Sequence, residues 1–206
     1  MKRLAILLSI FLLAGCAGMQ SPPEPPPPVF ADARFAPPSE PVGTDTLFAL
    51  SPAMRTYLNS PRFSAILRER GTRHGLVEAL YSKSDLQLEY ESSKTRTAAE
   101  TYAARAGNCL SLVIMTAAFA KALDMPVLYQ NIEAHNTWSR EAGLFLASSH
   151  VNIVLGERRM PNMHSVTDDQ QLLVDFIPSD AASRLRAHTI EEQDIIALYA
   201  NNRAAE

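Results

Sequence analysis

Three residues in the second half of the chain could form a nucleophile, its base and an orienting acid. Cys109 follows Gly107 and Asn108, a turn that would expose the start of a helix, and it opens a long apolar stretch. The unpaired amides and the dipole at a helix start stabilise negative charge, so a thiol placed there favours the nucleophilic thiolate. Such a nucleophile needs a base within hydrogen-bond reach and a third group that orients the base.

His150 and Asp175 are the candidates for the base and the orienting acid. His150 opens residues 150–155, an alternating run that predicts a strand. Asp175 lies late in the apolar run 172–176, where a carboxylate normally requires a partner such as an imidazole on a neighbouring strand. Each of the three residues also has a structural alternative: a small buried thiol, a satisfied histidine, and a carboxylate that caps a turn before Pro178.

A metal site is the other use for such side chains. The available ligands are Cys109, His135, His150 and His164. No pair among them has the tight spacing typical of zinc sites, so we expect neither a metal nor another cofactor.

Capping patterns predict the helices that would position these residues. Proline follows serine at the start of helices over 52–58 and 61–70, a third helix covers 76–81, and Thr97 with Glu100 predicts a capping box before a helix over 98–105. Gly107 is expected to break that helix. Residues 110–123 form a nearly continuous apolar run, too long for a strand, which predicts a buried central helix that ends before Pro126.

Short runs rich in β-forming residues predict the strands. These runs are 86–90, 127–129, 150–155 and 172–176, and we expect residues 135–149 and 157–171 to be long connections, the second with a turn at Asp168 and Asp169. A capping-box spacing at Thr189 and Glu192 predicts a last helix. The expected fold class is α+β, with a central helix packed on a small antiparallel sheet.

The first 16 residues predict export and lipidation. Lys2 and Arg3 precede a short apolar run, as in a secretory signal peptide. Residues 13–16, Leu-Ala-Gly-Cys, resemble the bacterial lipobox, which implies cleavage before Cys16 and anchoring through acyl chains such as palmitate. Ala17 in place of an aspartate implies, by the same resemblance, the outer membrane facing the periplasm. Cys109 would then be an unpaired thiol in an oxidising compartment.

The rest of the chain divides into a tether, one domain and a last helix. Residues 17–43 are rich in proline and predict an extended tether, since nine of the fourteen prolines lie between Gln20 and Gly43. Residues 44–188 have the size of one ordinary domain, and residues 189–206 form the last helix. The formal charge of −3, with acids and bases interspersed, gives no basic field for nucleic acid.

Taken together, these motifs resemble the transglutaminase-like superfamily. In that family a Gly-x-Cys motif opens a helix, a short motif with proline closes it, and His and Asp follow on successive strands. The matching residues are 95–102, 107–111, 122–127, 150–151 and 174–175, within a region from about 76 to 178. The resemblance implies a papain-like α+β core with extra N-terminal helices, and Cys109, His150 and Asp175 as a catalytic triad.

The resemblance also carries expectations about the reaction. Bacterial relatives are expected to act as proteases or amide hydrolases, so hydrolysis is preferred over amine transfer, on envelope proteins or peptides. The backbone amide of Cys109 is the natural oxyanion donor, and Asn108 and Gln130 are candidates for a second. Asn152 stands where the family often has tryptophan, and Asp124 where glycine is common.

Two alternatives concern the partners. The same fold could be a noncatalytic envelope module that binds a protein partner through its cleft or its C-terminal helix. The ending also resembles the point where such lipoproteins continue into tetratricopeptide repeats, although the residues after 189 are fewer than the ~34 of one repeat.

Overall fold

The structure is a computed structural model. It describes residues 36–37, 39–40, 42–82, 86–141, 144–156, 171–176 and 186–206, without the side chains of 133–141 and 144–149. The expected signal peptide with Cys16, most of the tether, the expected turn at Asp168 and Asp169, and His164 lie outside the described residues. Glu40–Glu206 form one compact unit, so this unit begins within the stretch expected to be a tether.

Four helices open the unit, and two of them are capped as their sequences predict. The Ser51 and Ser60 hydroxyls accept hydrogen bonds from the amides of Met54 and Phe63, and a proline takes the first helical position in each case. The third predicted helix begins earlier than 76, at Thr72, because Gly71 at φ 77° allows an abrupt change of direction. The bounds are α2 (Thr44–Leu47), α3 (Pro52–Leu58), α4 (Pro61–Arg70) and α5 (Thr72–Tyr81).

The segment after α5 is less extended than its alternating pattern predicts. Only β1 (Glu89–Tyr90) is a strand, because the amides of Leu86 and Leu88 bond back to carbonyls at the end of α5. The predicted capping box at Thr97 and Glu100 is present and starts α6 (Ala98–Ala104). That helix ends at Ala104, within one residue of the predicted end, and the residue that terminates it is Arg105, in the left-handed region at φ 53°, rather than Gly107.

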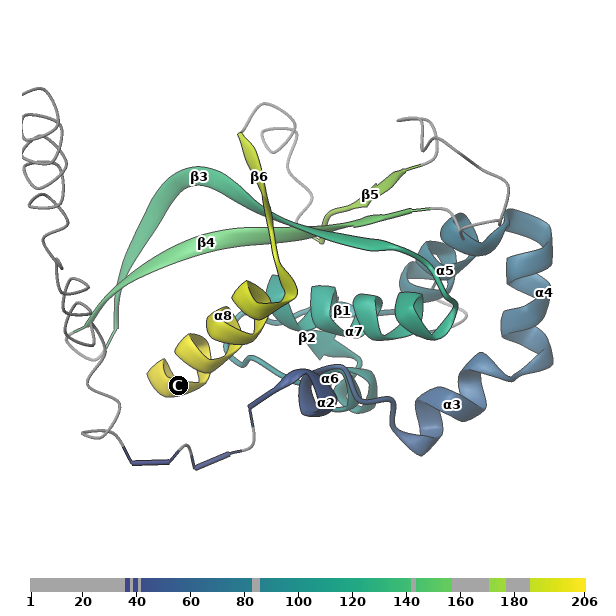
Figure 1. Ribbon diagram of the computed structural model, residues 1–206, viewed down its shortest axis with the longest axis horizontal. Helices are drawn as coiled ribbons and strands as arrows, with labels where there is room; N and C mark the ends of the chain where they lie inside the picture. The colour runs from purple at the N-terminus through teal and green to yellow at the C-terminus, as the bar shows by residue number, and fades with distance from the viewer. Residues whose placement is uncertain are drawn as a thin grey trace, which may run out of the picture. The chain divides into compact units, whose positions relative to one another are not determined.

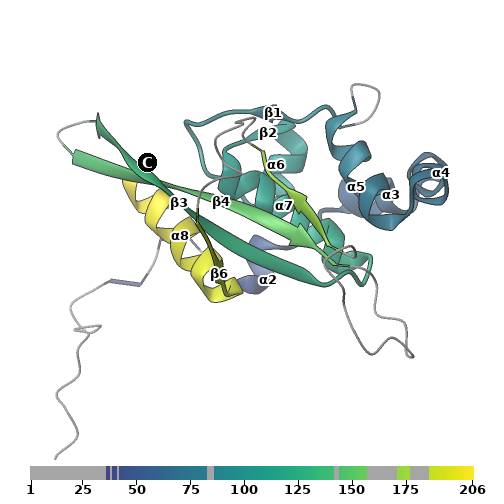
Figure 2. The same ribbon diagram turned by 90° about the horizontal axis from the view of Figure 1, so that it is seen from above.

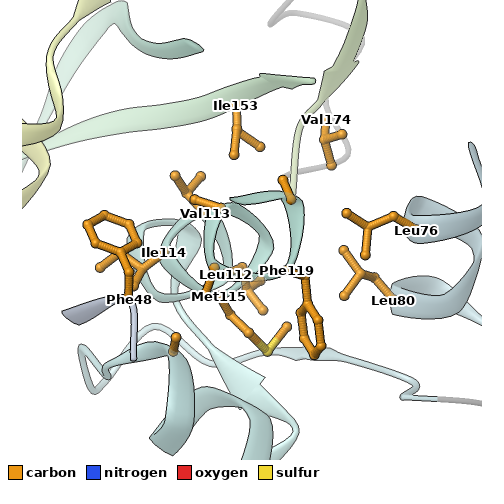
Figure 3. Packing of buried hydrophobic residues seen from close by; sticks show 14 of the residues in the cluster. Phe48, Leu76, Leu80, Leu112, Val113, Ile114, Met115, Phe119, Ile153 and Val174 are labelled. Atoms are coloured by element: carbon orange, nitrogen blue, oxygen red, sulfur yellow. The ribbon is translucent and has the colours of Figure 1, made fainter. Parts of the chain in front are cut away.

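The central helix, α7 (Cys109–Ala122), is the core of the unit. Every residue from Leu110 to Ala120 is buried, which explains the continuous apolar run in the sequence. Figure 3 shows its side chains meeting Ile153 and Val174 from the sheet on one side, and Leu76 and Leu80 from α5 on another. The helix is therefore fixed by packing all round its circumference.

A four-stranded antiparallel sheet lies over this helix. Its strand order is β5-β4-β3-β6, and Figure 1 shows α6, α7 and α8 below it. The bounds are β3 (Val127–Glu141), β4 (Leu144–Leu155), β5 (Leu172–Val174) and β6 (Ala187–Ile190). The fold class is α+β, as the sequence predicts, with a separate parallel pair of β1 and β2 (Ala106–Gly107).

The expectation of a long connection between the two central strands is wrong. Residues 135–149 are mostly not a connection, because β3 and β4 continue as a paired hairpin out to Glu141 and Leu144, past a register shift between Ile132 and Thr137. Cross-strand pairing, which a single strand's pattern does not reveal, carries the extended backbone through this polar stretch. The hairpin is visible in both Figure 1 and Figure 2.

The last helix also starts differently. Thr189 belongs to β6, which pairs with β3, so it is not the cap of a helix. Instead Glu191 and Asp194 form the capping box of α8 (Glu192–Ala205). Among the described residues, no helix has the length and apolarity needed to cross a membrane.

Candidate active site

Cys109 is the first residue of α7 and is half-buried. Asn108 caps this helix, since its side-chain oxygen accepts a hydrogen bond from the Ser111 amide at 2.9 Å. The amides of Cys109 and Leu110 precede the first intrahelical bond, which runs from Leu112 to the Asn108 carbonyl. The thiol therefore lies where the amides that have no intrahelical partner and the helix dipole would stabilise a negative charge on sulfur.

Gly107 is required by the close approach of the chain to this helix start. A Cβ at Gly107 would lie 2.7 Å from the Ser111 Cβ and 3.3 Å from the Thr101 methyl group. Both neighbours are buried and held by hydrogen bonds, so neither can move away freely. The glycine two positions before Cys109 thus has a steric reason.

His150 and Asp175 are brought together by neighbouring strands. His150 lies on β4, and Asp175 is the first residue past β5, the strand that pairs with β4. The imidazole Nε2 is 2.7 Å from the Asp175 Oδ1, and the two side chains are only 11% and 20% exposed. A partly buried carboxylate at this distance fixes the orientation of the ring.

The other nitrogen of the imidazole is left for Cys109. Nδ1 is buried and has no hydrogen-bond partner of ordinary geometry among the described residues. Interaction with the Cys109 side chain nevertheless raises the pKa of His150 above its ordinary value, the Asp175 charge adds to the rise, and burial opposes it. Since Nε2 is engaged by Asp175, Nδ1 is the atom available to the thiol. Catalytic hydrogen bonds are often long in a free enzyme.

Tyr81 supports the Asp175 end of this arrangement. Its hydroxyl donates a hydrogen bond to the Asp175 backbone carbonyl at 3.0 Å, and its ring stacks on Phe176 with centroids 5.8 Å apart. Burial raises the pKa of Tyr81 to about 12, and the Asp175 charge adds to the rise, so the phenol stays protonated and remains a donor. Tyr81 links the end of α5 to the end of β5.

Tyr90 lies near the Cys109 end. Burial raises the pKa of Tyr90, and negative charge at Cys109 raises it further. Tyr90 pairs with Gly107 across the parallel β1–β2 contact, and its side chain is 51% exposed. Sequence analysis missed both tyrosines, because Tyr81 is 94 positions from Asp175 and nothing in the sequence predicts a parallel β1–β2 pair.

The two candidates for a second oxyanion donor, Asn108 and Gln130, lie in different surroundings. Asn108 is buried, and its amide nitrogen donates to the Thr95 hydroxyl at 2.8 Å. Gln130 lies in the middle of the sheet, paired with Asn152 on one side and Thr189 on the other. Within the described residues, no hydrogen bond joins Gln130 to Cys109.

The remaining candidates are placed as follows. Asn152 is 2% exposed, and its Oδ1 has no partner among the described residues. The backbone of His135 belongs to β3, but its side chain lies outside the described part. Among the described residues, no three histidine, cysteine or acidic side chains are grouped to hold a metal ion.

The Asp175 carboxylate lies against the His150 imidazole, and the Cys109 side chain interacts with the same imidazole and raises its pKa. Comparisons with known proteins add nothing to this, since no family model, no curated protein and no solved structure matches the chain.

Proposed function

We propose that this chain is a cysteine-dependent amide hydrolase of the cell envelope, with Cys109 as nucleophile, His150 as base and Asp175 as the group that orients the base. One observation carries the proposal. His150 is held at Nε2 by Asp175 at 2.7 Å, its other nitrogen is buried and unpaired among the described residues, and the Cys109 side chain at the start of α7 raises the pKa of the imidazole.

The first half of the reaction is acylation. His150 takes the thiol proton, and the Cys109 sulfur forms a bond to the carbonyl carbon of an amide. The carbonyl oxygen becomes an oxyanion, to which the backbone amide of Cys109 can donate. As the C–N bond breaks, the imidazolium gives its proton to the leaving amine. Asp175 stabilises the imidazolium throughout.

The second half is deacylation. His150 takes a proton from water, and the water oxygen attacks the carbonyl of the thioester. The C–S bond then breaks, the acid product leaves, and the proton returns to the Cys109–His150 pair. An amine in place of water would give transfer instead of hydrolysis, and we prefer water because bacterial relatives in the resembling superfamily are expected to be hydrolases.

The fold supports a relation to the transglutaminase-like superfamily. A cysteine opens a buried helix that packs against β4 of an antiparallel sheet, and the histidine and aspartate follow in that order on adjacent strands. This is the order of a papain-like core, and α2 to α5 would be the additional N-terminal helices.

The proposed location is the outer membrane, with the chain anchored at Cys16. Replacing Cys16 by Ser should block both lipidation and processing, so the variant should keep residues 1–15, lack the acyl chains and differ in mass from the wild type, and less of it should sediment with membranes. An unchanged mass and unchanged fractionation would refute the anchor while leaving the proposed chemistry intact.

Hydrolysis is tested with a library of quenched fluorescent peptides and the full chain in detergent. We expect turnover by the wild type, a loss of roughly 10³-fold or more in Cys109→Ala and His150→Ala, and a smaller loss in Asp175→Asn. Labelled amine added to the same reactions measures transfer. Asp45→Asn, which removes an exposed carboxylate on α2, is the matched control for Asp175→Asn.

Turnover that survives Cys109→Ala would overturn the proposed chemistry. If no peptide is cleaved and Cys109 reacts with iodoacetamide at the same rate in wild type and His150→Ala, the noncatalytic binding module becomes the better account.

A further inference from the structure

A chain of hydrogen bonds connects α8 to the start of the helix that carries Cys109. The Asn202 side-chain amide donates to the Thr95 hydroxyl at 3.1 Å, and the Asn108 amide donates to the same oxygen at 2.8 Å. Asn108 in turn accepts from the Ser111 amide and caps α7. Thr95 is 1% exposed, so the hydrogen bonds that Asn108 and Asn202 donate to its hydroxyl are shielded from water.

The hydrogen bonds to Ser111 and Thr95 fix which way the Asn108 side chain faces. The Ser111 amide can only donate, so the oxygen of the Asn108 side chain must point to α7 and its nitrogen must point away. The nitrogen then needs an acceptor, because Asn108 is buried, and the Thr95 hydroxyl is that acceptor. Removing the hydroxyl would leave the buried Asn108 nitrogen without this acceptor, which would destabilise the capping orientation.

The backbone next to Thr95 is held from both sides. The Thr95 amide donates to the Glu206 carboxylate at 2.5 Å, and the Arg96 amide donates to the Ser111 hydroxyl at 2.8 Å. Arg203 fixes the Glu206 carboxylate through an ion pair at 2.8 Å. The same segment therefore contacts the last turn of α8 and the first turn of α7.

The helices α7 and α8 run antiparallel, so the end of α8 lies near the start of α7. Lys121, near the end of α7, pairs with Glu192, the first residue of α8, while Asn202 near the end of α8 reaches the start of α7 through Thr95. The Lys121 ammonium also lies over the Phe48 ring at 3.9 Å from its centroid. Contacts at both ends thus set the position of α8 along α7.

We propose that Thr95 and Asn202 are positioning residues for the nucleophile: through the Asn108 cap, the last turn of α8 holds the start of α7 so that the Cys109 thiol meets His150. This inference rests on the proposed function, since it assigns a role to Cys109. Neither residue touches the reacting atoms. The C-terminal helix becomes part of the active-site support rather than an addition to it.

The test measures the rate at which iodoacetamide alkylates Cys109 in the full chain, across pH, with the modified residue identified by mass spectrometry. Asn202→Ala should slow alkylation at pH 7 by about 2- to 30-fold, the range usual for coupled residues away from a site. Asn201→Ala is the matched control, because Asn201 is an exposed neighbour on the same helix. It should react like the wild type.

Thr95 offers a second pair of variants. Thr95→Val keeps the shape but loses the hydroxyl and should slow alkylation, whereas Thr95→Ser keeps the hydroxyl and should restore most of the rate and the wild-type pH profile. Thermal melting of each variant separates this effect from a loss of fold. Should Thr95→Val fail to fold, the Asn202→Ala and Asn201→Ala comparison still decides.

The outcomes separate this inference from the proposed function. Equal rates in Asn202→Ala and Asn201→Ala, with His150→Ala slower than both, would overturn the positioning role and keep the catalytic pair. Equal rates in the wild type and His150→Ala would overturn the catalytic pair itself, and the positioning role with it.

Discussion

At the scale of single residues, the site depends on the contacts of one imidazole, that of His150. Asp175 holds Nε2 of His150 at 2.7 Å, while Nδ1 is buried and has no partner among the described residues, so the two nitrogens lie in different surroundings. Interaction with Cys109 is the largest influence that raises the pKa of His150, and the Asp175 charge acts in the same direction. A histidine buried without these partners would show the opposite shift.

The titration of His150 follows from this balance. In Cys109→Ala and in Asp175→Asn, the His150 signals in NMR should titrate at lower pH than in the wild type, because each substitution removes a partner of the imidazolium. The shift should be larger for Cys109→Ala. Asp45→Asn, the exposed control, should leave the titration of His150 unchanged. An unchanged titration midpoint in both variants would show that neither Cys109 nor Asp175 affects the pKa of His150.

The same shift has a consequence for stability. Because the pKa of His150 is higher in the folded than in the unfolded chain, its proton stabilises the fold fully below about pH 6.5, the ordinary histidine value. This contribution is lost as the pH rises through the folded value. The stability difference between wild type and His150→Ala, measured in urea, should therefore shrink over that window.

Tyr81 is the residue whose role only the structure reveals. Tyr81→Phe removes the hydrogen bond to the Asp175 carbonyl while the ring can still stack on Phe176. We expect a loss of about 0.5–1.5 kcal/mol in the free energy of unfolding and a lower kcat with little change in KM, because the Asp175 carboxylate is held less firmly. Unchanged kcat with reduced stability would limit Tyr81 to a structural role.

At the scale of elements, the start of α7 depends on close packing. Residues 106–107 form β2, which pairs with β1, and the next residue caps the helix, so the chain passes from strand to helix within one residue. The Arg96 guanidinium also donates to the Ala106 carbonyl at 3.3 Å and pairs with Glu91. These contacts hold the segment that precedes Cys109.

Gly107→Ala tests this packing. The new methyl group would meet the Ser111 Cβ at 2.7 Å, so the first turn of α7 must shift. We expect a loss of about 1–3 kcal/mol in the free energy of unfolding and slower alkylation of Cys109. Gly43→Ala is the control, since a Cβ there has nothing within 4 Å. Equal behaviour of the two variants would show that the glycine is not required by packing.

The sequence predicted the elements best where a local signal exists. Local signals correctly predicted the serine and proline starts of α3 and α4, the Thr97 capping box and the buried helix α7. Each of these features depends on residues within a few positions of one another. The cysteine, histidine and aspartate could be selected for their chemical types. Pairing between segments could not be predicted. β6 and the Tyr81–Asp175 bond depend on partners far along the chain, and the outer part of the β3–β4 hairpin, although its partners are close in sequence, has no turn signal that predicts it.

At the scale of the whole molecule, the question is where the folded unit begins. The compact unit starts at Glu40, and the Arg203 guanidinium pairs with the Glu40 carboxylate at 2.7 Å and 3.3 Å. Hydrogen bonding to Arg203 lowers the pKa of Glu40. Val42 packs against the core as well. The segment just before α2 is therefore joined to α8, the helix that supports the start of α7.

Two fragments distinguish this boundary from the one that the proline content predicts. A fragment of residues 40–206 should melt at the same temperature as the full chain, because it keeps the whole unit. A fragment of residues 44–206 should melt at a lower temperature, since it loses the Val42 contact and leaves Arg203 with Glu206 alone. Adding Glu40→Gln to the longer fragment isolates the ion pair. If both fragments melt at the same temperature, residues 40–43 do not stabilise the unit, and α8 is held by its other contacts, which include α7, α2 and Thr95.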